Sequence, residues 1–405
     1  MTDTMITDKQ DKLVIGLFGF GVVGQGLYKV LQEVQTADAN IKSICVKQKD
    51  KPRSLESKLF TFNPDDLLND PEVNLIVELI DDADAAYQIV KTSLLNGKSV
   101  VSGNKNMLAH HLRELIDIQR EKGVALLYDA SACGSIPVIR NLEEYYDNDL
   151  LQSITGILNG SSNFILTKIF QQNWTYDEAL KHAQELGFAE NNPSFDVDGF
   201  DSMFKLIILA LHGFGTLVDP EEVFHYGISN VSDHDILYAR EKSKKIKLVA
   251  QVCKVNGKRF SMFVLPKLVS SDEYIFNVEE EYNGVIIEGQ FYDKQFMFGK
   301  GAGAFPTGSA VLSDITARKH HYRYEYKKLN FFASPVYTRE ITLEVYVRYH
   351  DLVDLSHFDF ESISEKYTGP DYNYVIGRLK LDNLHKMKNL IRKLNVFIAW
   401  TGKID

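Results

Sequence analysis

A short apolar segment that ends in glycine limits the fold of this chain more than any other feature. Residues 13–20 read LVIGLFGF, and the motif Gly19-Phe20-Gly21-Val22-Val23-Gly24 leads into a stretch of helical spacing. In such a motif the first glycine allows a tight turn, the second lets the backbone approach a pyrophosphate, and the third lets helix and strand pack closely. A lone GxGxxG motif also occurs in ordinary turns, but its position between a strand and a helix favours a dinucleotide-binding site.

The residues after this motif alternate between strand-like and helix-like segments. Further apolar strands are predicted at 41–46, 73–80, 99–102 and 124–128, and predicted helices at 85–96 and 108–122 each end before a glycine. A glycine in that position is typical of a helix C-cap. Strands that alternate with helices indicate parallel βαβ units with helices on both faces of the sheet. We therefore expect an α/β fold that begins with a Rossmann domain.

The residues after the second predicted strand affect the choice between NADP and NAD. An acidic residue about 20 positions beyond the glycines usually binds the ribose 2′-hydroxyl of NAD. This chain instead has Val46-Lys47-Gln48-Lys49, with Lys51 and Arg53 beyond. Cations at this point favour the 2′-phosphate of NADP, with Lys47 as the first candidate, whereas a solvated lysine-rich loop is the alternative. NADP is favoured, and NAD stays open.

Composition and charge narrow the classes of partner. The chain has 405 residues and a formal net charge of −10, which disfavours binding to nucleic acid. The densest apolar run, residues 206–211, is too short to span a bilayer, and residues 240–247 are interpreted as the solvated side of a helix. Three scattered cysteines, Cys45, Cys133 and Cys253, suit a reducing compartment. We expect a cytoplasmic protein that associates with neither nucleic acid nor membrane.

Residues 187–205 carry the highest density of candidate catalytic groups. The segment reads GFAENNPSFDVDGFDSMFK, with four carboxylates between Glu190 and Asp201. If a helix begins near Gly199, Asp201 and Lys205 are four residues apart and share one face. One interpretation is a surface ion pair at an acidic helix start. The other is a carboxylate pocket for a substrate ammonium, with a lysine that exchanges a proton with a hydroxyl.

Three further features lie where a ligand could reach them. Lys105 follows the predicted strand 99–102, and the carboxyl ends of parallel strands face the ligand. The segment Gly160-Ser161-Ser162-Asn163 lies between a predicted strand and a helix, so it either caps the helix or offers hydroxyl and N–H groups to a ligand. The glycine-rich segment 299–308 is either a turn or a close approach of the backbone to a flat ring.

Six segments occur in the order found in one enzyme family. They are GLFGFGVVGQG at 16–26, VVSGNKNMLA at 100–109, DASACGSIP at 129–137, GILNGSSNFILT at 156–167, AQELGFAENNPSFDVDGFDSMFKLIILA at 183–210 and GKGAGAFPTGSAVLSDI at 299–315. On these residues the chain resembles the homoserine dehydrogenase family over residues 13–318. The resemblance implies a homodimeric NAD(P)-dependent oxidoreductase that interconverts homoserine and aspartate semialdehyde in threonine and methionine biosynthesis.

The resemblance also implies roles for the charged residues. Lys205 resembles the acid–base lysine of the family, and Lys105 resembles a lysine shared between cofactor and substrate. Glu190 would hold the amino group of the substrate, Asp201 would lie beside the reacting hydroxyl, and Asp196 would orient the lysine. These residue types suit the reaction, because a cation near the carbonyl oxygen stabilises its developing charge and can supply a proton.

Further contacts are implied for substrate, cofactor and cation. Gly160 and Ser161 would line the substrate pocket, and Gly303 would lie near the nicotinamide. The dinucleotide would contact Phe20, Gly21, Val22 and Val23. A monovalent cation, Na⁺ or K⁺, would bind the backbone carbonyls of Asp129, Ala132, Gly134 and Ile136.

The chain departs from the family pattern at several positions. Asp81-Asp82 stands where small glycines are usual, close to the expected path of the cofactor. Phe188 replaces a tyrosine and Asp129 replaces a glutamate. Two other functions are alternatives: a dehydrogenase that uses Cys133 as a nucleophile, and a dinucleotide-sensing protein without catalysis. The intact lysines and Glu190 disfavour the second alternative.

These patterns divide the chain into four parts. Residues 1–12 are predicted to be a flexible N-terminus, and residues 13–148 the NAD(P)-binding Rossmann domain. Residues 149–318 form an α+β domain for substrate binding, catalysis and dimerisation, whose segment 299–308 returns to the cofactor site. Residues 319–405 form a small ACT-like α+β module, predicted from strands at 341–349, 372–381 and 396–400 and a helix at 384–394. Whether an effector such as threonine binds this module is left open.

Replacing Lys47 with glutamate tests the cofactor assignment. The variant Lys47→Glu is expected to move the preference from NADP toward NAD by about tenfold, because a carboxylate repels the 2′-phosphate. The ratio of kcat/KM with the two cofactors measures the change, and Lys122→Glu serves as a control outside the loop. An unchanged ratio would mean that another group binds the 2′-phosphate.

Overall fold

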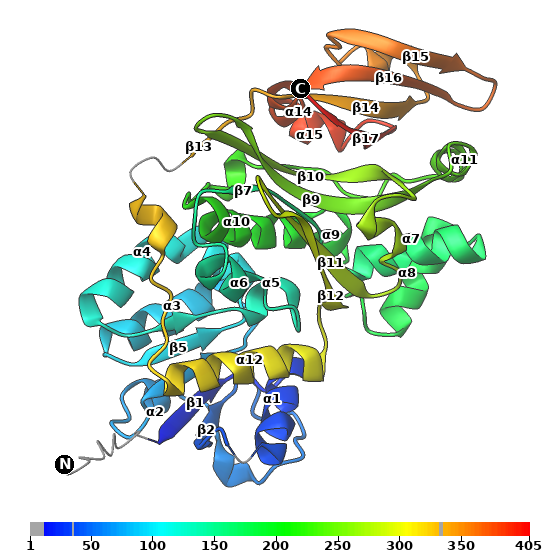
Figure 1. Ribbon diagram of the computed structural model, residues 1–405. Coiled ribbons are helices and arrows are strands. Elements are labelled where there is room, and N and C mark those ends of the chain that lie inside the picture. The colour runs from blue at the N-terminus through cyan, green and yellow to red at the C-terminus, as the bar shows by residue number, and fades with distance from the viewer. Residues whose placement is uncertain (1–11, 35, 332–334) are drawn as a thin grey trace. The chain divides into compact units, whose positions relative to one another are not determined.

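The computed structural model describes residues 12–34, 36–331 and 335–405, which form two compact units (Figure 1). The first unit extends to Ser135 and also includes Gly303–Glu325. The second unit consists of Ile136–Ala302 and Tyr326–Asp405. The predicted flexible N-terminus at 1–12 lies outside the described residues except for Lys12. Within the described ranges, no helix combines the length and the apolar character that a bilayer span requires.

A parallel sheet lies at the centre of the first unit. Its strands are β1 (Leu13–Phe18), β2 (Ala39–Cys45), β3 (Phe60–Thr61), β4 (Leu75–Glu78), β5 (Ser99–Ser102) and β6 (Leu126–Leu127). They are ordered β3-β2-β1-β4-β5-β6, and every neighbouring pair is parallel. This order is that of a Rossmann domain, in which the ligand lies at the carboxyl ends of the strands. The predicted α/β class and its N-terminal Rossmann domain are confirmed.

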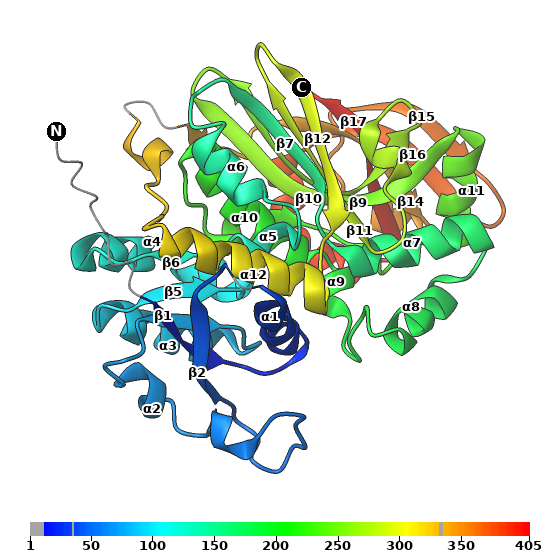
Figure 2. The same ribbon diagram turned by 60° about the horizontal axis from the view of Figure 1, so that its bottom comes forward.

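Helices flank this sheet, and one of them comes from much later in the chain. They are α1 (Val22–Glu33), α2 (Asp65–Leu68), α3 (Ala83–Leu95), α4 (Lys105–Lys122), α5 (Ala130–Cys133) and α12 (Ala304–Lys319). In both views α12 lies beside α1 (Figure 2). The contact requires glycine, because a Cβ at Gly26 would lie 1.9 Å from the carbonyl oxygen of Ala304. The glycine-rich segment 299–308 is therefore not a single loop, since α12 begins at Ala304.

The second unit is built on one large mixed sheet. Its strands are β7 (Leu151–Ile157), β8 (Phe224–His225), β9 (Lys244–Asn256), β10 (Arg259–Ser270), β11 (Tyr282–Gly289), β12 (Asp293–Lys300), β13 (Val336–Tyr337), β14 (Thr342–Tyr349), β15 (Ser362–Thr368), β16 (Asn373–Lys380) and β17 (Val396–Ile404). The main path is β12-β11-β7-β9-β10-β17-β14-β16-β15, with β8 and β13 also paired to β10. The last strand of the chain therefore joins the C-terminal strands to the sheet of the catalytic part.

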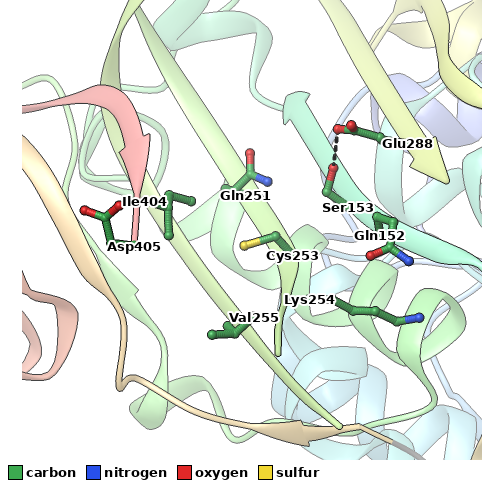
Figure 3. A pocket seen from close by; sticks show the side chains of 9 residues that line it. All are labelled: Gln152, Ser153, Gln251, Cys253, Lys254, Val255, Glu288, Ile404 and Asp405. Atoms are coloured by element: carbon green, nitrogen blue, oxygen red, sulfur yellow. Dashed lines mark hydrogen bonds between the residues drawn. The ribbon is translucent and has the colours of Figure 1, made fainter. Parts of the chain in front are cut away.

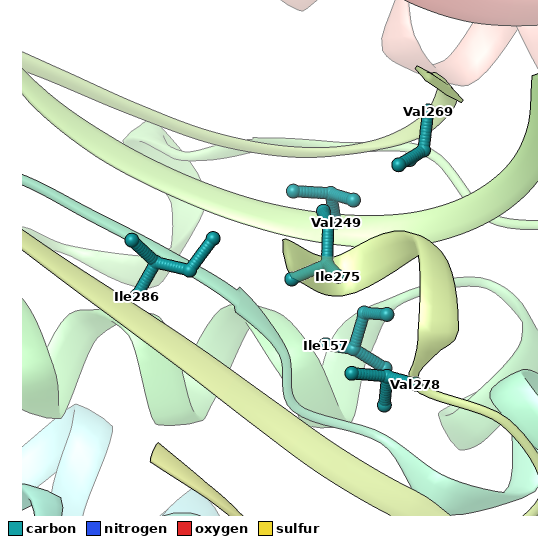
Figure 4. Packing of buried hydrophobic residues seen from close by; sticks show 6 residues of the cluster. All are labelled: Ile157, Val249, Val269, Ile275, Val278 and Ile286. Carbon is teal, nitrogen blue, oxygen red and sulfur yellow. The ribbon is translucent and has the colours of Figure 1, made fainter. Parts of the chain in front are cut away.

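The helices of the second unit pack on this sheet. They are α6 (Val138–Glu144), α7 (Gly160–Gln172), α8 (Tyr176–Glu185), α9 (Ser194–Val197), α10 (Phe200–Phe214), α11 (Asp233–Glu241), α13 (Leu352–Leu355), α14 (Leu381–Lys386) and α15 (Lys388–Ile391). Helix α10 is buried from Asp201 to Phe214. A cluster of buried aliphatic side chains packs between β7, β9, β10, β11 and the turn 274–278 (Figure 4); its members are Ile157, Val249, Val269, Ile275, Val278 and Ile286.

The interpretation of residues 240–247 as a solvated helix face is wrong. Helix α11 ends at Glu241, and β9 begins at Lys244. Lys247 is only 1% exposed, and its ammonium donates to Asn163 Oδ1 (3.1 Å) and pairs with Glu279 Oε2 (3.1 Å). Burial lowers the pKa of Lys247 to about 8. A lysine enters the core here because it finds an anionic partner and hydrogen-bond acceptors there.

The C-terminal part differs from its predicted elements in two respects. The helix expected at 384–394 is divided into α14 and α15. Strand β15 was not predicted because its residues are mostly exposed, so the alternation that marks a half-buried strand is missing. The observed order is strand, short helix, two strands, two short helices and a final strand, which is a small α+β module as expected.

A buried carboxyl group in the Rossmann unit gives a pH-dependent prediction. Glu78 ends β4, is 0% exposed, and accepts hydrogen bonds from Ser102 Oγ (2.6 Å) and the Ile80 N–H (2.8 Å). Burial raises the pKa of Glu78 from 4.5 to about 7. The folded state therefore holds this proton more tightly than the unfolded chain, so stability from this group is full below pH 4.5 and is lost as the pH rises through about 7.

The variant Glu78→Gln should remove this loss. Its thermal unfolding midpoint is expected to exceed that of the parent protein near about pH 8, with the difference shrinking toward about pH 5. The matched control Glu33→Gln, at an exposed position at the end of α1, should show no such trend. Parallel midpoints for Glu78→Gln and the parent protein across this range would contradict the prediction.

Candidate active site

A buried ion pair on helix α10 is the centre of the candidate site. Lys205 Nζ lies 2.7 Å from Asp201 Oδ2 and donates to the carbonyl oxygen of Leu158 at 2.8 Å. The two side chains are 8% and 4% exposed. The helix begins directly after Gly199, as predicted, so these residues share one face. The burial excludes a solvated surface ion pair.

Asn159 connects the carboxylates around this pair. Its Nδ2 donates to Asp196 Oδ1 (2.7 Å) and to Asp201 Oδ2 (3.0 Å). Its Oδ1 accepts from the Ser162 N–H (2.8 Å), which makes Asn159 the N-cap of α7. Sequence reasoning missed this residue, although its position before Gly160 is a recognisable N-cap signal. One amide side chain thus holds the start of α7 against both acidic positions.

This geometry allows Lys205 to exchange a proton from a fixed position of its Nζ atom. An ammonium has three N–H donors, and two of those on Lys205 are used by Asp201 and Leu158. The third can reach a substrate oxygen, so a proton can pass between Lys205 Nζ and a hydroxyl or carbonyl group. Asp201 keeps the side chain in place while this happens.

Gly160 and Ser161 begin helix α7 beside the acidic segment. A Cβ at Gly160 would lie 2.6 Å from the carbonyl oxygen of Glu281, so only glycine fits there. Ser161 Oγ donates to the carbonyl oxygen of Phe188, which ties the 187–191 segment to α7. The exposed side chain of Glu190 lies on this segment.

The Phe188 departure has a packing role in this structure. Its ring centroid lies 4.9 Å from that of Phe164 on α7. Phe188 lacks the hydroxyl of the tyrosine expected from the family, but its ring contact with Phe164 holds the segment 187–191 against α7.

The glycine motif in the first unit has the geometry of a phosphate-binding turn. Gly19 has φ +93°, and a Cβ there would lie 2.4 Å from the carbonyl oxygen of Leu79. Around Gly21 nothing lies within 4 Å of an added Cβ, so that position is open to a ligand. Helix α1 starts at Val22 with neither a side-chain cap nor an acidic residue in its first turn. Its N-terminal N–H groups can therefore bind an anion, which fits the diphosphate of NAD(P).

Two candidate cations of the first unit, Lys47 and Lys105, follow the carboxyl ends of strands. Lys47 is exposed two residues after β2, and Lys105 is the first residue of α4, shortly after β5. The Asp82 carboxylate accepts from the Ala85 N–H (3.1 Å) and caps α3. This departure from the family pattern therefore has a structural role. Whether Lys105 and Lys205 act on one oxygen stays a prediction, because they belong to different units.

The remaining predicted residues lie at turns. Gly303, with φ +127°, is the N-cap of α12. Gly134, with φ +53°, ends α5, and the carbonyl of Ile136 accepts from the Val138 N–H at 2.8 Å. A carbonyl oxygen has a second lone pair, so this bond does not prevent a carbonyl from binding a cation.

Two further observations concern metal binding by side chains and a nucleophilic role for Cys133. In the part of the chain that the structure describes, no group of three or more His, Cys, Asp or Glu side chains could hold a metal ion. The predicted cation would therefore depend on the backbone carbonyls of Asp129, Ala132, Gly134 and Ile136. Cys133 is buried, with 0% of its surface exposed, which removes support for its role as a nucleophile.

Comparisons with known proteins agree with this geometry. A family model described as homoserine dehydrogenase matches residues 137–316, and one described as its NAD binding domain matches residues 19–129. A homoserine dehydrogenase of Bacillus subtilis is 34% identical over 336 residues, which cover 81% of this chain and 77% of that protein.

Two solved structures are similar over long stretches. A homoserine dehydrogenase from Thiobacillus denitrificans has a TM-score of 0.80 and 29% identity, and the match covers 97% of each chain. A hyperthermophilic archaeal homoserine dehydrogenase in complex with NADPH has a TM-score of 0.68 and 27% identity, with 78% of this chain and 99% of that chain covered.

Proposed function

The chain belongs to the homoserine dehydrogenase family, and we propose that Lys205 exchanges the proton of its reaction while Asp201 and Asp196 position Lys205. The protein is an NAD(P)-dependent oxidoreductase that interconverts homoserine and aspartate semialdehyde. The observation that carries the proposal is the buried Lys205–Asp201 pair, held by Asn159 and the Leu158 carbonyl.

The proposed mechanism assigns one task to each group. A bound nicotinamide cofactor would supply the hydride chemistry at the carbinol or aldehyde carbon. Lys205 Nζ takes the hydroxyl proton in oxidation and gives a proton to the carbonyl oxygen in reduction. Asp201 and the carbonyl of Leu158 fix the position of Nζ, and Asp196 acts through Asn159 on the same group.

Substrate recognition is assigned to the neighbouring segments. The Glu190 carboxylate binds the ammonium group of homoserine, because a charged amine leaving water needs an anionic partner. Gly160 and Ser161 line the pocket at the start of α7. Lys105 supplies a second cation for the substrate oxygen and for the cofactor.

The cofactor is assigned to the first unit, with NADP preferred. The turn from Gly19 to Gly24 and the start of α1 bind the diphosphate, and Lys47 binds the 2′-phosphate. Gly303 would contact the nicotinamide end of the cofactor. The archaeal relative in complex with NADPH supports this preference. Backbone carbonyls of Asp129, Ala132, Gly134 and Ile136 would hold a monovalent cation that braces their segment.

The proposal extends to assembly and location. A homodimer is supported by exposed aromatic side chains at the terminal strand of the large sheet, β12. Phe298 on β12 is 53% exposed, and Phe291 just before β12 is 76% exposed. Such an edge usually needs a cover. A cytoplasmic location is supported by the three cysteines, all of which are free thiols.

The variant Lys205→Met tests the proposed acid–base role. It keeps the length of the side chain and loses the N–H donors, so kcat for homoserine oxidation should fall by about 10²-fold or more, with NADP affinity nearly unchanged. Production of reduced nicotinamide, followed by absorbance, measures the rate. The control Lys98→Met removes a buried lysine that donates to the Val73 carbonyl. Lys98 lies at the amino end of β5, whereas the cofactor is assigned to the carboxyl ends of the Rossmann strands. A Lys205→Met enzyme with the parental rate would remove Lys205 from the mechanism.

The variant Glu190→Ala tests substrate recognition. Its KM for homoserine should rise by about tenfold or more while kcat changes much less, because the carboxylate binds the ammonium without touching the reacting atoms. Steady-state kinetics with homoserine varied at saturating NADP measure both constants. Glu185→Ala, an exposed glutamate at the end of α8, should leave them unchanged. An unchanged KM in Glu190→Ala would mean that another group binds the amine.

A further inference from the structure

The C-terminal module, residues 342–405, binds the segment that connects α10 to α11. Lys388 Nζ pairs with Glu221 Oε2 at 3.0 Å, and the Glu221 carbonyl accepts from Lys388 and His385 at 2.8 Å. The hydroxyl of Tyr226 and the amide of Asn230 donate to one carbonyl, that of Val396, at 3.0 and 3.1 Å. The module is therefore attached to residues 221–230 by several polar contacts.

A buried ion pair strengthens this attachment. The guanidinium of Arg348 on β14 pairs with the Asp235 carboxylate at 3.0 Å and donates to the Asn230 carbonyl at 2.8 Å. The two charged side chains are 8% and 0% exposed. Breaking one partner of such a pair is costly, so the connecting segment is held firmly against the module.

The same segment packs against the acidic turn of the active site. The Ile228 N–H donates to the Val197 carbonyl at 2.7 Å, and a Cβ at Gly227 would lie 1.8 Å from that carbonyl oxygen. Ser229 Oγ donates to the Asp198 carboxylate. Asp198 lies between Asp196 and Asp201, so a shift of residues 225–229 would displace Asp201, which pairs with Lys205, and Asp196, which accepts from Asn159.

Arg392 of the module reaches this turn through two aromatic rings. A guanidinium nitrogen of Arg392 lies 3.1 Å from His225 Nε2, and the guanidinium carbon lies 5.1 Å from the centroid of the Phe200 ring. His225 Nδ1 lies 3.0 Å from the Asp198 carbonyl, and the His225 and Phe200 ring centroids are 4.2 Å apart. Phe200 is the first residue of α10, one position before Asp201.

The partners of His225 fix its tautomer. A carbonyl only accepts, so Nδ1 carries the proton and donates to Asp198. The same guanidinium nitrogen of Arg392 lies 3.1 Å from Nε2 and 3.5 Å from Nδ1, so it lies against the face of the imidazole ring. Burial lowers the pKa of His225 to about 4, and the charges of Arg392 and Lys388 act in the same direction, while the Asp198 carbonyl bond and the Asp198 carboxylate oppose it. The ring therefore stays neutral at working pH and does not repel the guanidinium of Arg392.

We propose that Arg392 is a positioning residue of the active site, which fixes the turn carrying Asp196 and Asp201 through His225 and Phe200. This inference rests on the proposed roles of Asp201 and Lys205. Arginine suits the position because its planar guanidinium stays charged, donates in the plane and stacks on aromatic faces. The C-terminal module is accordingly a structural part of the active site.

The variant Arg392→Ala is the direct test. Arg392 is exposed, so the variant should fold with a nearly unchanged unfolding temperature. Its kcat for homoserine oxidation should fall about tenfold, because a small displacement of the turn misplaces Lys205, while KM for NADP stays constant. Arg392→Lys, which can donate to His225 but cannot stack in the same way, should recover part of the rate. Lys393→Ala removes the neighbouring exposed charge and should match the parent enzyme.

A double-mutant cycle with His225→Asn distinguishes the route. Asparagine keeps a donor for the Asp198 carbonyl and loses the imidazole ring that contacts Arg392 and Phe200, so Arg392→Ala should reduce kcat much less in this background than in the parent. Additive effects would overturn the proposal, as would a parental kcat in Arg392→Ala. A parental rate in Lys205→Met would instead refute the proposed function, whereas an inactive Lys205→Met enzyme beside a fully active Arg392→Ala enzyme would refute this inference alone.

Discussion

The burial of one ion pair sets the requirements that the rest of the catalytic unit meets. Lys205 and Asp201 lie on a buried and mostly apolar helix, and charges removed from water are stable only when paired and hydrogen-bonded. Asn159 and the Leu158 carbonyl, at the end of β7, complete this set of partners. The strand-to-helix junction at 158–161 and the start of α10 must therefore stay in register, and the substrate meets a group whose position is fixed before it binds.

The segments around the ion pair are also held in place by contacts with their neighbours. The acidic turn at 196–201 contacts α7 through Asn159 on one side and residues 225–229 on the other. The second contact is backed by the C-terminal module, which shares a sheet with the catalytic part through the parallel pairing of β10 and β17. Catalytic geometry thus depends on long-range packing, in which a surface arginine and a buried carboxylate are connected through a neutral histidine ring.

The sequence revealed the parts of the molecule whose signals are local. The glycine motif, the helix start at Gly199 and the Asp201–Lys205 spacing each lie within a few residues, and the Rossmann sheet and the ion pair agree with them. Asn159, Lys247 and Arg392 act on residues far away in the chain, and no local pattern shows such contacts. Strand β15 lacked an apolar face, and the basic residues at 240–247 concealed the start of a buried strand. The structure at these positions is determined by contacts between residues that are distant in the sequence.

The return of helix α12 to the Rossmann unit has a consequence for biosynthesis. Helix α1, which ends at Glu33, packs on α12 through Gly26, yet α12 begins only at Ala304. While the chain emerges from the ribosome, the nucleotide-binding half thus lacks one of its helices until the large sheet has been translated up to β12. The first unit therefore cannot complete its folding before the second unit has been translated. A fragment that ends at Ser135 would expose the glycine face of α1 to solvent and to chaperones.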